Sequence, residues 1–119
     1  MDAEQLKDRT KKMSLEVFRL VAPIPHGREV DVIVKQIIRS SSSVAANYRA
    51  ACKARSKADF ISKIGIVEEE ADETAFWLDY LVDLNFVDPR KAGPLIKEIK
   101  ELVAIFTASG RTAKQNRLK

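Results

Sequence analysis

The chain has 119 residues, of which 45% are hydrophobic, and carries 21 lysines and arginines against 17 acidic residues. This length suits one domain with its own core, and this apolar content argues against wholesale disorder. A single cysteine excludes an internal disulfide, so we expect a protein of the reducing cytoplasm. The first ten residues include acids where a signal peptide needs an apolar run, and no apolar stretch reaches the ~20 residues of a membrane span.

Charge is unevenly distributed along the sequence. Residues 28–63 hold eight lysines and arginines against three acids, whereas residues 64–89 hold eight acids and no basic residue. The last eleven residues, 109–119, hold four basic residues and no acid. Such segregation produces one positive and one negative region, which favours binding to polyanions or to other copies of the chain.

The first predicted helix covers about residues 3–21. Apolar residues recur there with helical spacing and form one face, whereas Leu15 and Phe18 lie well off that face. We therefore expect the helix to be apolar on two sides. The segment 23–27 contains two prolines and a glycine, and it ends the helix because proline lacks a backbone donor and restricts the preceding residue.

The second predicted helix covers about residues 29–54. Its apolar residues share one side, and four basic residues fall on the opposite side: Lys35, Arg39, Arg49 and Lys53. The serine run 40–43 is also typical of a linker, but the apolar phase continues through it without slipping, which favours a helix. Small side chains here would let another helix approach closely.

The third predicted helix covers about residues 57–84, and the pair Ser56 and Asp59 predicts its N-terminal cap. Beside its core seam runs a second stripe, formed by Ile66, Glu73, Trp77, Tyr80 and Leu84. A helix in a monomeric bundle needs one apolar stripe, and aromatic residues are enriched at protein interfaces. We therefore interpret this stripe, with Leu15 and Phe18, as an oligomer interface; partial burial at the bundle edge is the alternative.

The fourth predicted helix covers about residues 91–108. Pro94 is expected in its first turn, where a missing N–H is tolerated, and Ser109-Gly110 is expected to end it. The basic, polar residues 111–119 are then predicted to be a disordered tail.

Residues 1–110 are thus expected to fold as one domain. No segment shows the alternating pattern of a strand, and short connections make consecutive helices antiparallel. The sequence predicts an all-α fold, an antiparallel up-down-up-down four-helix bundle.

Clustered acids are the first candidate for chemistry. They loosely resemble the magnesium sites of all-helical nucleotide pyrophosphatases, and the residues concerned are Glu69, Glu70, Glu73, Glu98 and Glu101. A magnesium-dependent nucleotide hydrolase is therefore one hypothesis. However, Lys97 and Lys100 flank the second pair, whereas carboxylates must converge to hold Mg²⁺. A solvated or inter-subunit charged face is the favoured interpretation.

Other catalytic arrangements lack the residues they need. The only histidine, His26, lies in a proline-rich turn, and a ferritin-like di-iron site needs two Glu-x-x-His motifs. Cys52 follows a basic cluster, which can activate a thiol, but no base partner is evident, so we interpret it as a packed residue. No glycine-rich phosphate loop occurs. We predict no catalytic residue, no metal site and no cofactor.

Basic residues form the strongest candidate binding site. They are Lys35, Arg39, Arg49, Lys53, Arg55, Lys57, Arg111 and Lys114. Phosphate backbones are bound by such charge without reading of the base sequence. We therefore predict contact with RNA or DNA through these residues. A solvated face, or a face that pairs with acids of a neighbouring subunit, is the alternative.

Several short motifs resemble those of a known family. They are Ser43-Val44 with Asn47, Arg55-Ser56, Asp59-Phe60, and Glu68–Glu70 with Glu73. In these the chain resembles the four-helix-bundle proteins encoded in intervening sequences of bacterial 23S ribosomal RNA genes. The resemblance is strongest over residues 37–84. Many family members carry Glu-Gly where this chain has Arg49-Ala50, so it resembles a divergent subgroup.

The resemblance implies an antiparallel four-helix bundle that assembles into a ring, typically a pentamer, without known catalytic activity. A related branch comprises the accessory proteins of diversity-generating retroelements, which form basic five-membered barrels and bind a reverse transcriptase and nucleic acid. By analogy we expect a non-enzymatic homo-oligomer that binds RNA or DNA. The alternative is a protein–protein adaptor for a nucleic-acid enzyme such as a reverse transcriptase.

Overall fold

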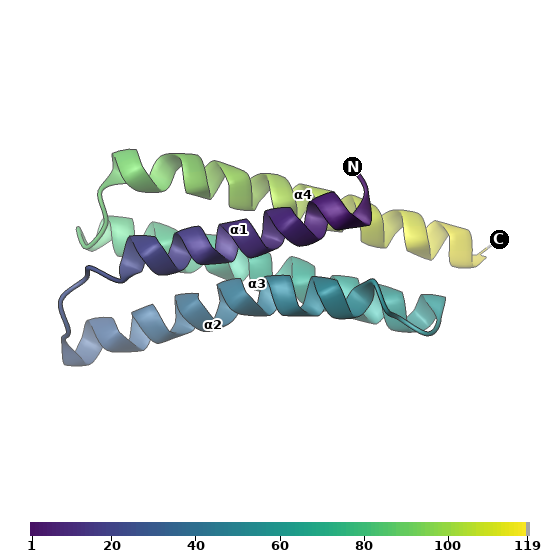
Figure 1. Ribbon diagram of the computed structural model, residues 1–119, viewed down its shortest axis with the longest axis horizontal. Helices are drawn as coiled ribbons and strands as arrows, with labels where there is room; N and C mark the ends of the chain where they lie inside the picture. The colour runs from purple at the N-terminus through teal and green to yellow at the C-terminus, as the bar shows by residue number, and fades with distance from the viewer. Residues whose placement is uncertain (119) are drawn as a thin grey trace.

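The computed structural model describes residues 1–118, which form four helices packed side by side in an elongated bundle (Figure 1). Each helix packs against the next one along the chain, and α1 also packs against α4. The predicted all-α, antiparallel up-and-down bundle is therefore confirmed. It measures 51 × 25 × 21 Å. The helices are α1 (Ala3–Val21), α2 (Arg28–Ala51), α3 (Lys57–Asp83) and α4 (Pro89–Leu118).

Helix α1 begins and ends where the sequence predicts. Asp2 caps it, because its carboxylate accepts a hydrogen bond from the backbone N–H of Gln5 at 2.8 Å. The Gln5 side chain accepts in return from the backbone N–H of Asp2 at 3.0 Å. This reciprocal pair satisfies two donors that have no partner inside the helix.

The serine run lies inside α2, as the continuous apolar phase predicts, and is not a linker. Ser40 is fully buried where α2 packs on α3, and its hydroxyl lies 3.0 Å from that of Thr74. Within its own helix, the Ser40 hydroxyl donates to the carbonyl of Ile37 at 3.3 Å and the Thr74 hydroxyl donates to that of Glu70 at 2.8 Å. Burial therefore leaves no hydroxyl unpaired, and the small side chains let the two helices approach closely.

Helix α2 ends at Ala51, three residues before the predicted end. Two short-range hydrogen bonds form a tight turn there. The N–H of Lys53 donates to the carbonyl of Ala50, and the N–H of Ala54 donates to the carbonyl of Ala51, each at 3.0 Å. Ser56 then adopts an extended conformation and accepts from the N–H of Asp59 at 3.0 Å, which confirms the predicted cap of α3. The connection is therefore longer than the sequence suggests.

Helix α4 is longer than predicted at both ends. It begins at Pro89, so Pro94 lies in its second turn, and it continues through Gly110 to Leu118. The segment expected to be a disordered tail is therefore helical as far as residue 118; Lys119 lies outside the described residues. Gly110 faces α3, since a Cβ atom there would lie 3.6 Å from Cγ2 of Ile64. The extension covers the first turns of α3, which residues up to 108 would leave bare.

Replacing Gly110 by alanine tests this longer helix. Because Gly110 lies inside α4 without a positive φ and with room for a Cβ, Gly110→Ala should raise the free energy of unfolding by about 0.5–1 kcal/mol. Urea denaturation measures the change. Gly65→Ala, in the middle of α3 with open space at its Cβ, is the control and should stabilise by a similar amount. Destabilisation by Gly110→Ala alone would indicate a helix that ends at residue 110.

Candidate nucleic-acid interface

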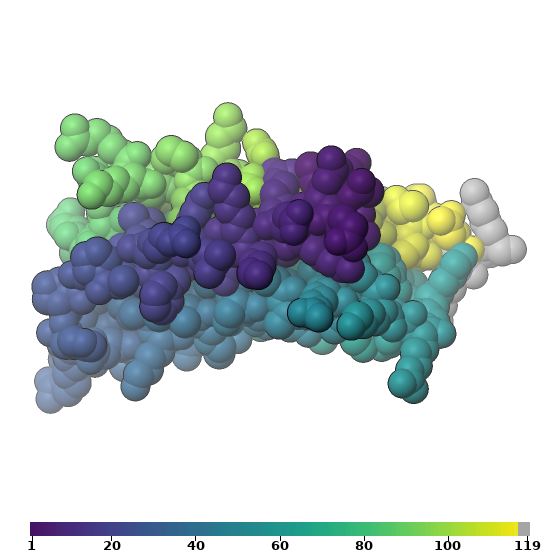
Figure 2. Space-filling model, viewed as in Figure 1, coloured from purple at the N-terminus to yellow at the C-terminus, as the bar shows by residue number. Residues whose placement is uncertain are grey.

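Three segments far apart in sequence meet at one end of the bundle. They are the start of α1, the connection between α2 and α3, and the end of α4 (Figures 1 and 2). This end carries six of the eight basic residues predicted to bind nucleic acid, and we call it the basic end. Those six residues are Arg49, Lys53, Arg55, Lys57, Arg111 and Lys114.

The charges of the basic end are available to a ligand. All six side chains are exposed. Within residues 1–118, none of the six forms an ion pair with a carboxylate, whereas Lys7 pairs with Glu4 and Lys63 with Asp59 nearby. The structure thus gathers exposed cations without ion-pair partners at one end, where Glu4 and Asp8 line a groove with Arg49 and Lys53, and Glu68 lines one with Arg111 and Lys114.

The other two predicted residues lie elsewhere. Arg39 is held between α2 and α3, where its guanidinium binds Glu70 at 3.0 Å and Glu73, and its Nε donates to Gln36 at 3.1 Å. Its charge is therefore already neutralised. Lys35 is one turn nearer the N-terminus of α2, towards the opposite end of the bundle. The structure does not bring these two residues together with the basic end.

The carboxylates considered for a magnesium site are divided between two helix pairs. Arg9 of α1 binds Glu98 at 2.6 Å and Glu101 at 2.9 Å on α4, and the hydrogen bonds that it donates to Glu98 raise the pKa of Arg9. Glu70 and Glu73 instead bind Arg39 between α2 and α3. Over residues 1–118 no three metal-ligating side chains come close enough to hold an ion. The geometry therefore offers no support for the hydrolase hypothesis.

The predicted interface residues form two separate apolar surfaces. On α1, Leu15 and Phe18 are exposed, Phe18 by 55%. On α3, the rings of Phe76, Trp77 and Tyr80 lie against one another, and Ile66 and Leu84 are exposed elsewhere along the helix; we call these five residues the aromatic patch. Because α1 packs against α2 and α4 but not against α3, the two surfaces lie on different faces.

The aromatic patch differs from the predicted stripe at two positions. Phe76, 54% exposed, belongs to it although it was not predicted; its spacing of four residues from Tyr80 is the signal that indicates a shared face. Its ring lies 4.9 Å from that of Trp77 and 5.8 Å from that of Tyr80, between centroids. Trp77 is partly buried, and its indole N–H donates to Glu73 at 3.3 Å.

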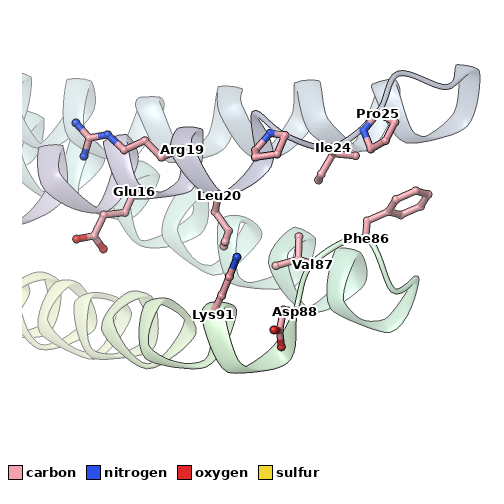
Figure 3. A pocket seen from close by; sticks show the side chains of 10 residues that line it. Glu16, Arg19, Leu20, Ile24, Pro25, Phe86, Val87, Asp88 and Lys91 are labelled. Atoms are coloured by element: carbon pink, nitrogen blue, oxygen red, sulfur yellow. The ribbon is translucent and has the colours of Figure 1, made fainter.

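A hollow of about 450 Å³ lies at the opposite end of the bundle, between the α1–α2 and α3–α4 connections (Figure 3). Phe86 and Ile24 supply apolar walls. The charged side chains around it are of both signs, Glu16 and Asp88 against Arg19 and Lys91. This mixture does not favour a polyanion.

Comparison with known proteins identifies the fold family. A model of the 23S rRNA-intervening sequence protein family matches residues 4–108. The chain belongs to this family. The family match confirms the resemblance found over residues 37–84, and it ends before the α4 extension that carries Arg111 and Lys114.

A solved structure supports the same assignment. It is the crystal structure of a protein with unknown function from the S23 ribosomal protein family of Bacteroides thetaiotaomicron VPI-5482. That protein is 28% identical to this family member, with a TM-score of 0.83, and the alignment covers 93% of this chain and 99% of the other. A search of curated proteins found no match. Within residues 1–118, no helix combines the length and hydrophobicity that crossing a bilayer requires.

Titration of Asp59 tests the electrostatics of the basic end. The hydrogen bond from Lys63, 2.7 Å long, lowers the pKa of the Asp59 carboxyl, and the charges of Lys63 and Arg55 lower it further. This stabilisation is present above the ordinary pKa of aspartate and is lost as pH falls through the lowered pKa. Lys63→Ala should therefore raise the pKa of Asp59 and weaken the loss of stability in acid.

Carboxyl NMR titration and urea denaturation at neutral and acidic pH measure the two effects. Lys100→Ala, which removes an exposed cation far from Asp59, is the control and should change neither. An Asp59 pKa that stays low in Lys63→Ala would show that another group holds it there.

Proposed function

We propose that this member of the 23S rRNA-intervening sequence protein family is a non-enzymatic homo-oligomer that binds the phosphate backbone of RNA or DNA through its basic end. The observation that supports this most is the grouping of six exposed cations without carboxylate partners at one end of residues 1–118. Lysine and arginine that neutralise phosphates release condensed counterions, which drives binding independently of sequence.

The distribution of acidic residues favours binding of a nucleic acid to the basic end rather than along the side of the bundle formed by α3. Beyond its first turns α3 is acidic, with Glu69, Asp72, Asp79 and Asp83 exposed along it. Arg39, which lies between α2 and α3, is already paired with Glu70 and Glu73. A phosphate backbone along α3 would therefore be repelled, whereas a phosphate backbone across the basic end would meet mainly positive charge.

The two apolar surfaces favour contact between copies of the chain. Basic side chains surround Leu15 and Phe18 on α1, including Lys11 and Arg19, whereas acids surround the aromatic patch on α3. The surfaces are thus complementary in charge and both apolar, so α1 of one copy can pack on α3 of the next. Such head-to-tail contacts form a ring when the rotation closes. Five copies is the ring size that the family resemblance leads us to expect.

A ring would also strengthen nucleic-acid binding. Cyclic symmetry relates equivalent surfaces of all copies, so bundles that run along the ring axis would present all their basic ends on one face of the assembly. A strand long enough to span neighbouring copies then gains from several weak contacts at once.

Salt dependence tests the nucleic-acid half of the proposal. Binding to a generic RNA or DNA duplex, followed by fluorescence anisotropy, should weaken steeply as salt rises. The triple variant Lys53→Ala, Arg55→Ala, Lys57→Ala should bind more weakly, because three phosphates are no longer neutralised. Its slope of log affinity against log salt should be shallower by roughly two to three units, about 0.9 for each of these phosphates.

A second triple variant separates location from total charge. Lys35→Ala, Lys97→Ala, Lys100→Ala removes the same number of exposed cations away from the basic end. It should retain nearly all of the affinity. Equal losses of affinity in the two variants would mean that net charge alone drives binding. If the wild type does not bind, the proposed nucleic-acid binding is wrong.

Sedimentation tests the assembly half. The wild type should sediment near five times the 13.4 kDa of one chain, whereas Phe18→Glu or Tyr80→Glu should shift it towards the monomer by placing a charge in a desolvated contact. Phe86→Glu, at a residue as exposed as Tyr80 but on the α3–α4 connection, is the matched control and should leave the assembly intact. A monomeric wild type at micromolar concentration would contradict ring formation.

An adaptor for a nucleic-acid enzyme is the second candidate. The hollow beside Phe86 supports it, because apolar walls among charges of both signs suit a protein surface better than phosphate (Figure 3). It lies at the end of the bundle opposite the basic end. A pull-down that recovers one protein after nuclease treatment, and loses it with Phe86→Ala, would favour this candidate.

A further inference from the structure

The basic end contains a cavity that has no role in the proposed binding of a nucleic-acid phosphate backbone. It has a volume of about 630 Å³ and lies between the α2–α3 connection and the extension of α4. Small side chains create the space: Ala51 and Ala54 on one side, Ala113 on the other, and Ala3 from α1. Ligand sites in proteins typically span roughly 300–1,000 Å³, so the cavity is large enough for a small planar group.

Aromatic rings form part of the cavity wall. Phe60 lines it from the first turn of α3 and packs partly against the core. Tyr48 lines it from α2, and its ring lies 5.4 Å from that of Phe106, between centroids, so its position is fixed by the core. Burial raises the pKa of the Tyr48 hydroxyl, and the Cys52 thiol adds to that rise, so the hydroxyl stays protonated at neutral pH.

Polar and charged groups are placed at the same cavity. Ser56 and Asn116 line it with a hydroxyl and an amide, which can donate and accept hydrogen bonds. Arg55 and Lys57 also line it, and neither forms an ion pair within residues 1–118. Apolar walls, hydrogen-bonding groups and adjacent cations match the three parts of a nucleotide: the faces of its base, the edge of its base and its phosphate.

We propose that this cavity receives one unpaired base of a single-stranded nucleic acid while Arg55 and Lys57 contact the adjacent phosphates. This inference rests on the proposed binding of phosphate backbones at the basic end. A base in a duplex is excluded, because its faces are stacked and its pairing edge is occupied, whereas an unpaired base stacks on aromatic side chains. The charge of the neighbouring residues selects a nucleotide over a neutral apolar ligand.

Abasic oligonucleotides test the role of the base directly. A ten-nucleotide oligodeoxythymidine and an abasic strand of the same length carry the same charge, so they differ only in the bases. At one fixed salt concentration, anisotropy titration should give roughly tenfold tighter binding for the strand with bases. An oligouridine of equal length forms the RNA arm, and tighter binding of either base-bearing strand than of the abasic strand supports the proposal.

Filling the cavity should remove this preference. Ala113→Leu places a larger side chain in the cavity from α4, so the base-bearing strand should bind no more tightly than the abasic one. Ala104→Leu, on an exposed part of the same helix, is the matched control and should keep the tenfold preference. Phe60→Ala is a second variant, expected to reduce the preference by removing the stacking surface. Circular dichroism melting shows whether each variant folds.

The outcomes separate the cavity from the proposed function. Equal binding of base-bearing and abasic strands by the wild type, with affinity that falls as salt rises, would overturn the cavity proposal and leave backbone binding intact. Binding by none of the strands would overturn both. A preference for bases that persists in a folded Ala113→Leu variant would place the base elsewhere and overturn the proposal.

Discussion

The rest of the structure depends on the close packing of α2 against α3, where Ser40 of α2 meets Thr74 of α3 in the buried interior. Their hydroxyls lie 3.0 Å apart, and each also lies within hydrogen-bond distance of a carbonyl of its own helix, so both stay paired where the two helices meet. Because both side chains are small, α2 and α3 pack closely along their length. The register in which α2 packs on α3 places the C-terminus of α2 near the N-terminus of α3, and five residues connect them.

That register also sorts the charges. It places Arg39 between Glu70 and Glu73, so the middle of the α2–α3 face is neutralised by contacts within the chain. Between α1 and α4, Arg9 holds Glu98 and Glu101 in the same way. Lys53 and Arg55 of the α2–α3 connection, and Arg111 and Lys114 of the α4 extension, form no such pair within residues 1–118. The four acids that pair with Arg9 and Arg39 are therefore not available to the cations of the basic end, which stay without ion-pair partners.

Features that depend on neighbouring residues in sequence could be predicted, and features that depend on register could not. The bounds of α1 and the Ser56 cap follow from local signals, namely proline, glycine and the spacing of a hydroxyl before an acid. Gly110 carries the local signal of a helix end, but α4 continues through it beside Ile64 of α3. The helical periodicity predicts a polar face for Arg39, but its partners Glu70 and Glu73 follow from the α2–α3 register. For the candidate site, the residue types were predicted, whereas their division into a basic end and two outliers required the fold.

Hydrogen exchange with and without a short RNA, followed by mass spectrometry, tests the central claim most directly, because it locates the bound ligand on the intact protein. The account predicts slower exchange in peptides that cover residues 49–60 and 108–118, which form the basic end and its cavity, and unchanged exchange around the α1–α2 and α3–α4 connections at the opposite end. Protection along the acidic part of α3, or none at the basic end while RNA is bound, would contradict it.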